Sequence, residues 1–383
     1  MSNSNGDESP ENYTAHPPPP PPPPSLSLLP DEIVLRCLAR VPRSYDLSLS
    51  WVSKDLRSLV RSPELTKLRS ILHKSSLHLC LEENESTVKW LTLRPTEETE
   101  TTEEYRLVPN PTPFPSHPSY RSSAVAVGSK IFFIGGGCRR PSTALWILDT
   151  RSGNISQGAR MSVPRDVEEA AVGLIDGKIY VIGGGRFGEE EIQVEVFDPK
   201  SETWELAGLE NLPKFPRCSA SVEGKVYMVE DDNTAVYNPR ESEGERLVQI
   251  VSERPSKGGR KKKLGEAVLR VCVVEDVLFA FFCRTGLMWF DTKLNVWRRL
   301  VVRDGKEMFI FYADAIAEYD GKLAVLFTWG ERKVDDDVTK IVRCKLVSLH
   351  RAGDRICGTI DWSGAVGTVP YSFYFLHCLA VSH

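Results

Sequence analysis

The segment Ala170–Gly185 reads AAVGLIDGKIYVIGGG, and the segment Ser122–Gly137 reads SSAVAVGSKIFFIGGG. The two segments superimpose position by position, since both combine short apolar runs with a closing triplet of glycines. Ile131 and Ile179 hold the same place in the two copies and lie 48 residues apart. Self-similarity at a period of about 50 residues indicates an array of repeated structural units, so this repeat decides the fold.

The repeat continues in both directions in weaker form. Equivalent apolar residues recur at spacings of 45 to 52 residues, and they are Leu79, Val226, Leu278 and Leu323. Four copies share a second landmark, a strand-like run that ends in Asp or Asn before a turn: Leu145–Asp149, Val194–Asp198, Ala235–Asn238 and Met288–Asp291. Each unit is therefore predicted to hold several short strands joined by tight turns.

Tryptophans mark the end of two of these units. Trp204 and Trp297 each lie six residues beyond the aspartate of their copy, which predicts a hairpin whose indole ring packs into the unit. Four strands at this period are typical of one blade of a kelch β-propeller. The paired glycines Gly135-Gly136 and Gly183-Gly184 and the strand Asp176–Tyr180 resemble the kelch motif.

The number of blades follows from the two ends of the repeat region. Residues 75–109 provide only three strands, at Leu77–Leu81, Lys89–Leu93 and Tyr105–Val108, whereas residues 371–381 (YSFYFLHCLAV) provide one strand too many. A C-terminal strand that completes the first blade closes the ring and removes its exposed edges. We therefore predict six blades, sealed by strands from both ends of the region.

Residues 25–72 have a helical rather than a strand-like pattern. Leu29-Pro30-Asp31-Glu32 predicts a helix start, because proline suits the first turn and acidic residues complement the positive end of the helix dipole. Apolar residues then follow at helical spacing until Pro42, and Ser62-Pro63-Glu64 is a second helix start. Several short helices in so few residues enclose a very small core, which gains stability from docking on a partner.

Four pieces of this segment resemble an F-box in order and spacing: Leu29–Ile33, Leu49–Lys54, Leu56–Val60 and Ser62–Leu65. Trp51 and Leu56 depart mildly from the residues that are common at their positions in that family. The resemblance implies binding to a Skp-type adaptor and, through it, to the cullin and RING subunits of a ubiquitin ligase. The matched positions that it assigns to the adaptor-facing surface are Leu29, Pro30, Ile33, Leu38, Val41, Leu49 and Val52.

Composition limits the classes of partner. The 383 residues are 41% hydrophobic and 26% charged, which is typical of a folded protein, and the net charge of −4 gives no general attraction to nucleic acid or to an anionic membrane. The longest apolar runs, such as Val277–Cys283, fall far short of a membrane span. Nine cysteines without a CxxC pair indicate reduced thiols and a cytoplasmic or nuclear location.

The chain thus divides into three predicted parts. Residues 1–24, which include the block Pro17–Pro24, form a disordered proline-rich tail; residues 25–72 form a small all-α F-box motif; and residues 75–383 form a six-bladed propeller. The fold class is therefore mainly β.

The sequence contains no local signature of catalysis or of a cofactor. Seven histidines are scattered without a metal-ligand spacing, and there is no GxSxG nucleophile motif. The triple glycines precede neither a helix nor a Lys-Ser/Thr pair, so they do not indicate a phosphate loop. We therefore expect no catalytic residue, no metal and no cofactor.

Arginines recur just before the first strand of several blades, at Arg121, Arg165 and Arg217. This position lies near one mouth of the propeller channel, where the three arginines would form a positive rim that suits a carboxylate-bearing or phosphorylated segment. The alternative, that they bridge backbone carbonyls between blades, is equally compatible with the pattern. Loops after the second strands add further candidates for target binding: Arg139, Arg186, Phe187, Arg284 and Trp329.

The combined resemblance implies the substrate-recognition subunit of an SCF-type cullin–RING ubiquitin ligase, which itself catalyses no bond chemistry. Two alternatives remain open: a ligase-independent protein-binding scaffold, and a propeller enzyme with a site assembled from several blades. The basic run Arg260–Lys263 is either a nuclear-localisation signal or a solvated loop between blades. The sequence does not identify the target protein.

Overall fold

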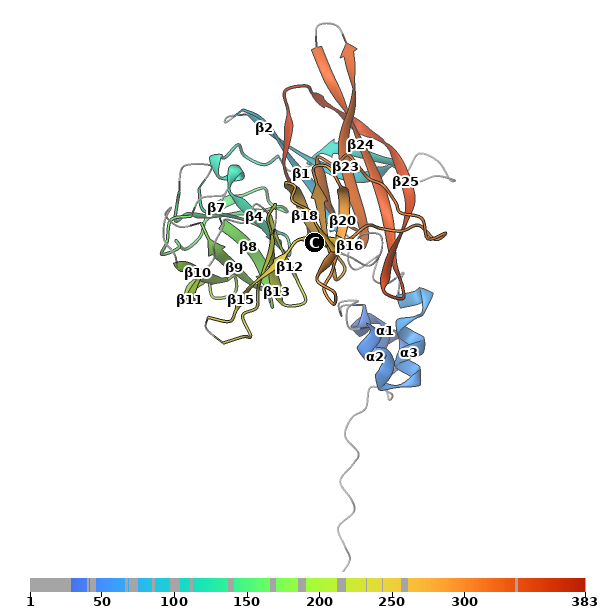
Figure 1. Ribbon diagram of the computed structural model, residues 1–383. Coiled ribbons are helices and arrows are strands. Elements are labelled where there is room, and N and C mark those ends of the chain that lie inside the picture. The colour runs from blue at the N-terminus through green and yellow to red at the C-terminus, as the bar shows by residue number, and fades with distance from the viewer. Residues whose placement is uncertain are drawn as a thin grey trace, which may run out of the picture.

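The structure is a computed structural model, and it describes residues 29–39, 41, 46–65, 68, 75–84, 87–96, 104–110, 113–136, 141–165, 170–184, 191–211, 218–231, 233–242, 244–255, 261–334 and 337–382. Among the described residues, three short α-helices lie beside a ring of β-sheets (Figure 1). The predicted tail, residues 1–24, lies outside the described residues.

Three α-helices are described in the N-terminal segment, and the first begins directly after Pro30, as the start signal predicts. They are α1 (Asp31–Leu38), α2 (Asp46–Val52) and α3 (Lys54–Val60). The carbonyl of Pro30 accepts the first hydrogen bond of α1, and Asp31 and Glu32 occupy its first turn. Ser53 caps α3, since its Oγ accepts a hydrogen bond of 3.0 Å from the backbone N–H of Leu56. A small apolar core holds the helices together: Val34, Leu38, Ala39, Leu56 and Leu65.

Six four-stranded antiparallel sheets form the blades of a β-propeller. Blade one contains β26 (Tyr374–Ser382), β1 (Ser75–Asn84), β2 (Thr87–Thr96) and β3 (Glu104–Pro109). Blade two contains β4 (Ser123–Val127), β5 (Lys130–Ile134), β6 (Leu145–Asp149) and β7 (Ile155–Gln157). Blade three contains β8 (Ala170–Ile175), β9 (Lys178–Gly183), β10 (Glu191–Asp198) and β11 (Thr203–Asn211).

The other three blades follow in chain order. Blade four contains β12 (Cys218–Val222), β13 (Lys225–Val229), β14 (Asn233–Tyr237) and β15 (Leu247–Val251). Blade five contains β18 (Val268–Val274), β19 (Val277–Phe282), β20 (Gly286–Asp291) and β21 (Val296–Arg298). Blade six contains β22 (Ala315–Tyr319), β23 (Lys322–Val334), β24 (Asp337–Ala352) and β25 (Arg355–Pro370). The prediction of a six-bladed, mainly β propeller is therefore confirmed.

The residues that set the period in the sequence occupy one structural position. All six lie in the second strand of their blade, and each is at most 1% exposed: Leu79, Ile131, Ile179, Val226, Leu278 and Leu323. Because this strand packs against neighbouring blades on both faces, its pattern must be apolar in every blade. That requirement explains why the repeat can be recognised in the sequence of the blades that lack the glycine pair.

The ring closes as predicted. β26 pairs antiparallel with β1, with Leu79 opposite Cys378 and Ser75 opposite Ser382, so the C-terminal strand is the innermost strand of blade one. The strand begins at Tyr374, because residues 371–373 turn away from β25 before it starts. Each of the six blades thus has its inner strand in place.

Two features differ from the sequence-based expectations. The sequence places the basic run in a loop between blades, but Lys261–Lys263 form β17, which pairs with β16 (Glu253–Pro255) as a separate two-stranded sheet between blades four and five. In blade six, β24 and β25 have 16 residues each and extend well beyond the other blades (Figure 1). Neither feature repeats along the chain, so the period carries no information about them.

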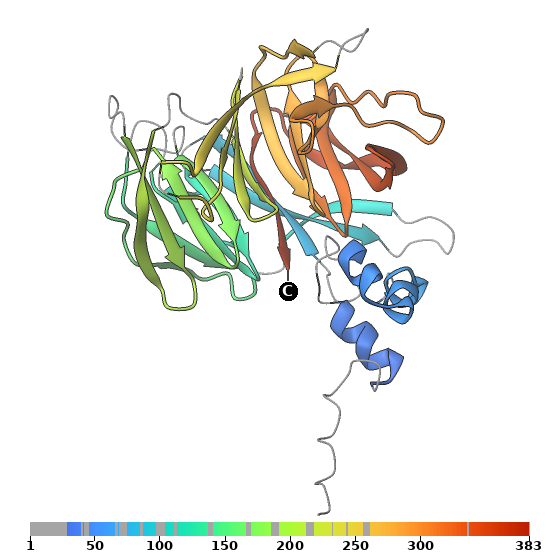
Figure 2. The same ribbon diagram turned by 60° about the horizontal axis from the view of Figure 1, so that its bottom comes forward.

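Strand direction defines two faces of the ring. In each antiparallel blade, the link between the second and third strands and the link to the next blade leave from the same end. We call this end the inter-blade face. β1 starts at the opposite end, and the helices lie on that side of the ring together with the C-terminus (Figure 2).

Candidate functional site

The helical segment exposes a group of large apolar side chains. Leu29 and Ile33 are exposed at the start of α1, and Trp51 and Val52, at the end of α2, are 78% and 71% exposed. Pro30 is exposed beside them. Burial of such side chains contributes about 25 cal/mol per Å² of apolar area, so these residues favour contact with a partner surface.

Three of the residues that the F-box resemblance assigns to the adaptor are placed differently. Leu38 is only 5% exposed and belongs to the core between the helices, so it supports the surface and does not form it. Leu49 packs partly against the same core, and Val41 is half-buried just after α1. Conversely, Trp51, which departs from the residues common at its position in F-box sequences, is the most exposed large apolar residue among the described residues of the helices.

Arg165 corrects the prediction of a positive rim. Its side chain is fully buried, its Nη2 lies 2.7 Å from Oε2 of Glu195, and its Nη1 donates to the backbone carbonyls of Gly183 and Gln193. Burial lowers the pKa of the guanidinium, while the hydrogen bond and charge of Glu195 oppose this shift. Arg165 therefore ties the link after blade two to blade three, which was the alternative interpretation of the arginine pattern.

Arg121 lies at the channel mouth, but it too is paired. Its Nε is 2.5 Å from Oε1 of the buried Glu82, whose Oε2 accepts a hydrogen bond of 2.6 Å from the hydroxyl of Tyr374. The three residues come from the start of blade two, from β1 and from the closing strand β26. They join the two ends of the ring, so the charge of Arg121 is largely balanced within the fold by Glu82.

Of the other predicted target-binding residues, the structure describes two. Arg284 is exposed in the link between β19 and β20, and Trp329 is 53% exposed in β23; both lie at the inter-blade face. Arg139, Arg186, Phe187 and Arg217 lie outside the described residues.

Trp329 belongs to a larger group of exposed aromatic residues that the sequence reasoning missed. We call it the aromatic cluster, and it consists of Phe309, Phe311, Tyr312 and Trp329. The rings of Phe309 and Phe311 stack with centroids 5.5 Å apart, and Tyr312 meets Trp329 edge to face at 5.1 Å. The guanidinium of Arg299 lies over Phe309, 4.8 Å from its centroid.

The local sequence contains a signal for this cluster. In the segment Met308–Tyr312 (MFIFY), Met308 and Ile310 are buried, while the aromatic residues Phe309, Phe311 and Tyr312 are exposed. The carbonyl of Ile310 accepts a hydrogen bond of 3.0 Å from the N–H of Leu287, which anchors the segment on blade five. The segment lies between two repeat landmarks, so an alternation of aromatic and aliphatic residues outside the repeat could have marked it.

A cavity of about 590 Å³ occupies the propeller channel. It is lined by the first strand of every blade, including small residues such as Ser123 and Ser219. Arg270 projects from β18, and its guanidinium donates to the carbonyls of Asp314 and Phe375 at 2.8 and 3.2 Å. Arg270 therefore bridges blades five, six and one across the channel wall.

Within the described residues, we find no group of three or more His, Cys, Asp or Glu side chains arranged to hold a metal ion. No helix in the described part of the chain is both long enough and apolar enough to cross a bilayer.

Comparison with known families assigns both folded parts. A model of the F-box domain matches residues 26–68, and a model described as the FKB95 kelch-repeats domain matches residues 89–367. The chain belongs to the F-box/kelch-repeat family. The kelch match covers most of the chain but ends before β26, so the closing strand is defined by the pairing in the structure.

Relatives in Arabidopsis thaliana have the same organisation throughout. A putative F-box/kelch-repeat protein is 44% identical over 392 aligned positions, which cover 94% of this chain and 97% of that protein. A second F-box/kelch-repeat protein is 38% identical over 99% of this chain and 100% of its own length. An F-box domain joined to a kelch propeller implies, in general terms, the role of a substrate adaptor in SCF-type ubiquitin ligases, and this F-box/kelch-repeat chain has both parts.

Proposed function

We propose that this protein is the target-recognition subunit of a cullin–RING ubiquitin ligase. In this proposal, the exposed apolar residues of the helices bind a Skp-type adaptor, and the inter-blade face of the propeller binds a target protein. The chain performs no bond chemistry, because its contribution is to hold the target close to the ubiquitin-loaded enzyme. The observation that carries the proposal is the pair of exposed apolar surfaces, one on the helical segment and one on the propeller.

The proposed adaptor-binding surface is supported by the contrast between buried and exposed apolar residues in the helices. Val34, Leu38 and Leu56 are buried and fill the small core, whereas Ile33 on α1 and Val52 on α2 remain exposed. A core of this size contributes little free energy of folding, so docking of the exposed residues on an adaptor would stabilise the segment as well as recruit it.

The target-binding surface is supported by composition and position. Aromatic residues and arginine are the side chains that most often dominate binding energy at protein interfaces, and the aromatic cluster with Arg299 combines both. The cluster lies toward the inter-blade face, whereas β1 leaves the F-box at the opposite face. Adaptor and target would therefore occupy different sides of one rigid ring and would not compete.

Two sets of substitutions test the proposal in the full-length protein. Leu29→Asp with Val52→Asp should abolish co-purification with a Skp-type adaptor, because both place a charge in an apolar interface. Trp329→Ser with Phe311→Ser should leave adaptor binding unchanged and should reduce the set of proteins labelled by a proximity-labelling fusion in cells.

The same two assays are applied to a matched control variant. Leu206→Ser changes an exposed leucine on β11, far from both surfaces, and should behave as the wild type in both measurements. Adaptor binding that survives the helix substitutions would refute the placement of the adaptor-binding surface, whereas a wild-type protein that binds no adaptor would leave a ligase-independent scaffold. An unchanged labelling profile in the aromatic variant would refute the placement of the target surface.

A further inference from the structure

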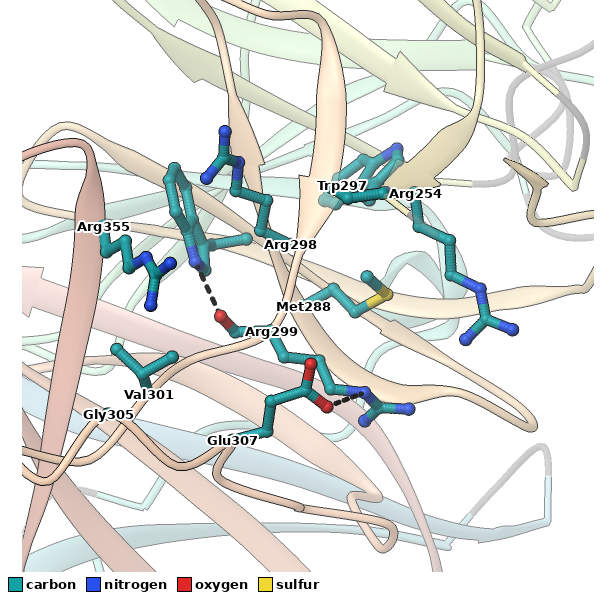
Figure 3. Close-up of a pocket in the computed structure, with 11 residues that line it drawn as sticks. Arg254, Met288, Trp297, Arg298, Arg299, Val301, Gly305, Glu307 and Arg355 are labelled. Atoms are coloured by element: carbon teal, nitrogen blue, oxygen red, sulfur yellow. Dashed lines mark hydrogen bonds and ion pairs between the residues drawn. The ribbon is translucent and has the colours of Figure 1, made fainter. Parts of the chain in front are cut away.

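A pocket of about 310 Å³ lies at the outer side of the ring between blades five and six. Its walls come from β16, from β20 and β21, from the segment that follows β21, and from the start of β25 (Figure 3). Met288, Trp289 and Trp297 are buried and form its apolar floor. Four arginines line the pocket: Arg254, Arg298, Arg299 and Arg355. Glu307 is the only acidic residue among its described lining residues.

One of these arginines is already neutralised. The Nε of Arg298 lies 3.1 Å from Oδ2 of Asp291, and its Nη1 lies 3.4 Å from Oδ2 of Asp354. In Figure 3 its guanidinium points away from that of Arg299. Arg298 is therefore part of the wall and leaves the positive charge of the pocket to the other three arginines.

Arg299 is only partly satisfied. Its Nε lies 3.5 Å from Oε2 of Glu307, and its Nη1 is buried without a hydrogen-bond partner among the described residues. Neither Arg254 nor Arg355 forms an ion pair in the described part of the chain. Apart from Arg298, the lining thus holds three guanidinium groups and one carboxylate, so it carries an excess of positive charge, which Glu266 outside the lining reduces in part at Arg299.

The arginines repel one another in the structure as it stands. Burial lowers the pKa of the Arg299 guanidinium and the positive charge of Arg254 adds to the lowering, whereas the negative charges of Glu307 and Glu266 oppose it. In Figure 3 Arg254 and Arg299 extend from different elements toward the same side of the pocket, next to Met288. A bound anion would relieve this repulsion and would provide an acceptor for the unpaired Nη1 of Arg299.

The lysines of the basic run add positive charge near the pocket. Arg254 on β16 lies directly opposite Lys262 on β17, and residues paired in this way point to the same side of a sheet. Lys263 is exposed on the same two-stranded sheet, and Lys261 is exposed there too but lies 3.9 Å from Oε2 of Glu253, which offsets its charge. This sheet contacts the outer strand β21, so its positive charge is held beside the pocket.

The exposed rings of Phe309 and Phe311 adjoin the pocket. The guanidinium of Arg299 lines the pocket and at the same time lies over the exposed rings of Phe309 and Phe311, with centroids at 4.8 and 5.8 Å. A ligand whose anionic group reaches Arg299 therefore places its neighbouring groups on these rings. The arrangement suits an anion that is carried on a side chain next to apolar residues.

We infer that this pocket binds a phosphorylated side chain of the target protein, with the phosphoryl group held by Arg254 and Arg299 and the adjacent apolar residue on Phe309 and Phe311. The inference deepens the proposed function and rests on it. A phosphoryl group carries about two negative charges and three acceptor oxygens, which matches the excess of guanidinium donors better than a single carboxylate does.

A protein ligand fits better than a nucleic acid. The pocket has room for one phosphoryl group and its side chain, and acidic residues such as Asp291, Asp354 and Glu253 lie around it. A nucleic-acid strand needs a positive groove that follows successive phosphates, which these carboxylates interrupt.

The test uses the full-length protein on an array of peptides that carry a central phosphoserine, phosphothreonine or phosphotyrosine, each beside its unphosphorylated counterpart. The affinity for the strongest binder is then measured by fluorescence polarisation. We expect the phosphorylated peptide to bind at least tenfold more tightly than its counterpart. Arg254→Gln and Arg299→Gln should each weaken this binding tenfold or more, because each removes charge-assisted hydrogen bonds.

Arg240→Gln provides the matched control. Arg240 is an exposed arginine in the turn after β14, at the opposite face, and its substitution should leave the affinity unchanged. If Arg299→Gln lowers the melting temperature, Arg254→Gln decides alone, since Arg254 lies on a peripheral strand. Equal binding of phosphorylated and unphosphorylated peptides, or wild-type affinity in both arginine variants, would overturn the inference.

Two further measurements separate the possible failures. Binding of a short single-stranded oligoribonucleotide as tightly as the best phosphopeptide would overturn the assignment to a protein ligand. Adaptor binding is measured on the same preparations and should be intact in every arginine variant. Loss of the phosphopeptide result with adaptor binding retained refutes only this pocket, whereas a wild-type protein that binds no adaptor refutes the proposed ligase role.

Discussion

At the scale of single residues, the glycine pairs show how a local signature serves a contact between blades. Gly135 has a positive φ of 83°, and a Cβ placed there would lie 2.9 Å from the backbone oxygen of Arg165. The same oxygen accepts a hydrogen bond of 3.0 Å from the N–H of Gly136. The kelch glycines therefore allow the backbone of one blade to approach the segment that positions the buried Arg165.

Alanine substitutions at two glycines test this explanation. Gly128 also has a positive φ, of 58°, but a Cβ at that position would meet no described atom within 4 Å. Gly128→Ala should cost about 1 kcal/mol of unfolding free energy from backbone strain alone. Gly135→Ala should cost about 1 to 3 kcal/mol more, because the added methyl group meets backbone atoms.

Urea denaturation of both variants measures the difference. The explanation from close approach fails if Gly135→Ala is no more destabilising than Gly128→Ala, since both positions share the backbone strain.

At the scale of elements, the sequence predicted those strands and helices that obey a local period. β6 spans Leu145–Asp149 as predicted, and α1 begins directly after Pro30. The β16–β17 sheet and the long strands of blade six were not predicted, because each is stabilised by partners specific to one place in the ring. β25, for example, packs against β3 of blade one, more than 240 residues earlier in the chain.

The closing strand β26 should make the stability of the protein depend on pH. Burial lowers the pKa of His377 to about 4, the positive charge of Arg270 acts in the same direction, and the hydrogen bond to the Tyr120 carbonyl and the charge of Glu82 oppose it. The folded state thus holds this imidazole neutral, whereas the unfolded chain protonates it near pH 6.5. The contribution is complete above about pH 6.5 and is lost as the pH falls toward 4.

The expected loss is about 2 kcal/mol, less than the full pKa difference implies, because the ring borders the channel cavity. Unfolding free energies of the wild type and of His377→Gln, measured between pH 7 and pH 4, provide the check. The glutamine variant should show a shallower dependence on pH. The same slope in both proteins would contradict a role for His377.

At the scale of the whole molecule, stability depends on ring closure. Eight residues of β26 pair with β1, and Val381 and Phe375 are buried where the strand packs into the first blade. Arg121, Glu82 and Tyr374 add a polar connection across the same junction. Loss of β26 would expose the inner edge of blade one and break the continuous contact between blades.

Truncation after Pro370 should therefore abolish cooperative thermal unfolding of the propeller. The expected result is the loss of the near-ultraviolet circular dichroism signal and of a single melting transition. Tyr371→Ser, which changes an exposed residue just before β26, serves as the control and should melt as the wild type does. A truncated protein with an unchanged melting temperature would show that closure by β26 is dispensable.

The sequence by itself determined the six-bladed ring, its closure and the helical motif, because each of these repeats a local pattern or matches one. Only the tertiary structure decided that Arg165 and Leu38 are buried, that the aromatic cluster is exposed, and that Arg254 and Arg299 share one pocket. The physical reason is separation along the chain. Burial of Arg165 depends on Glu195, and the pocket joins β16 to β25, so no local period records either contact.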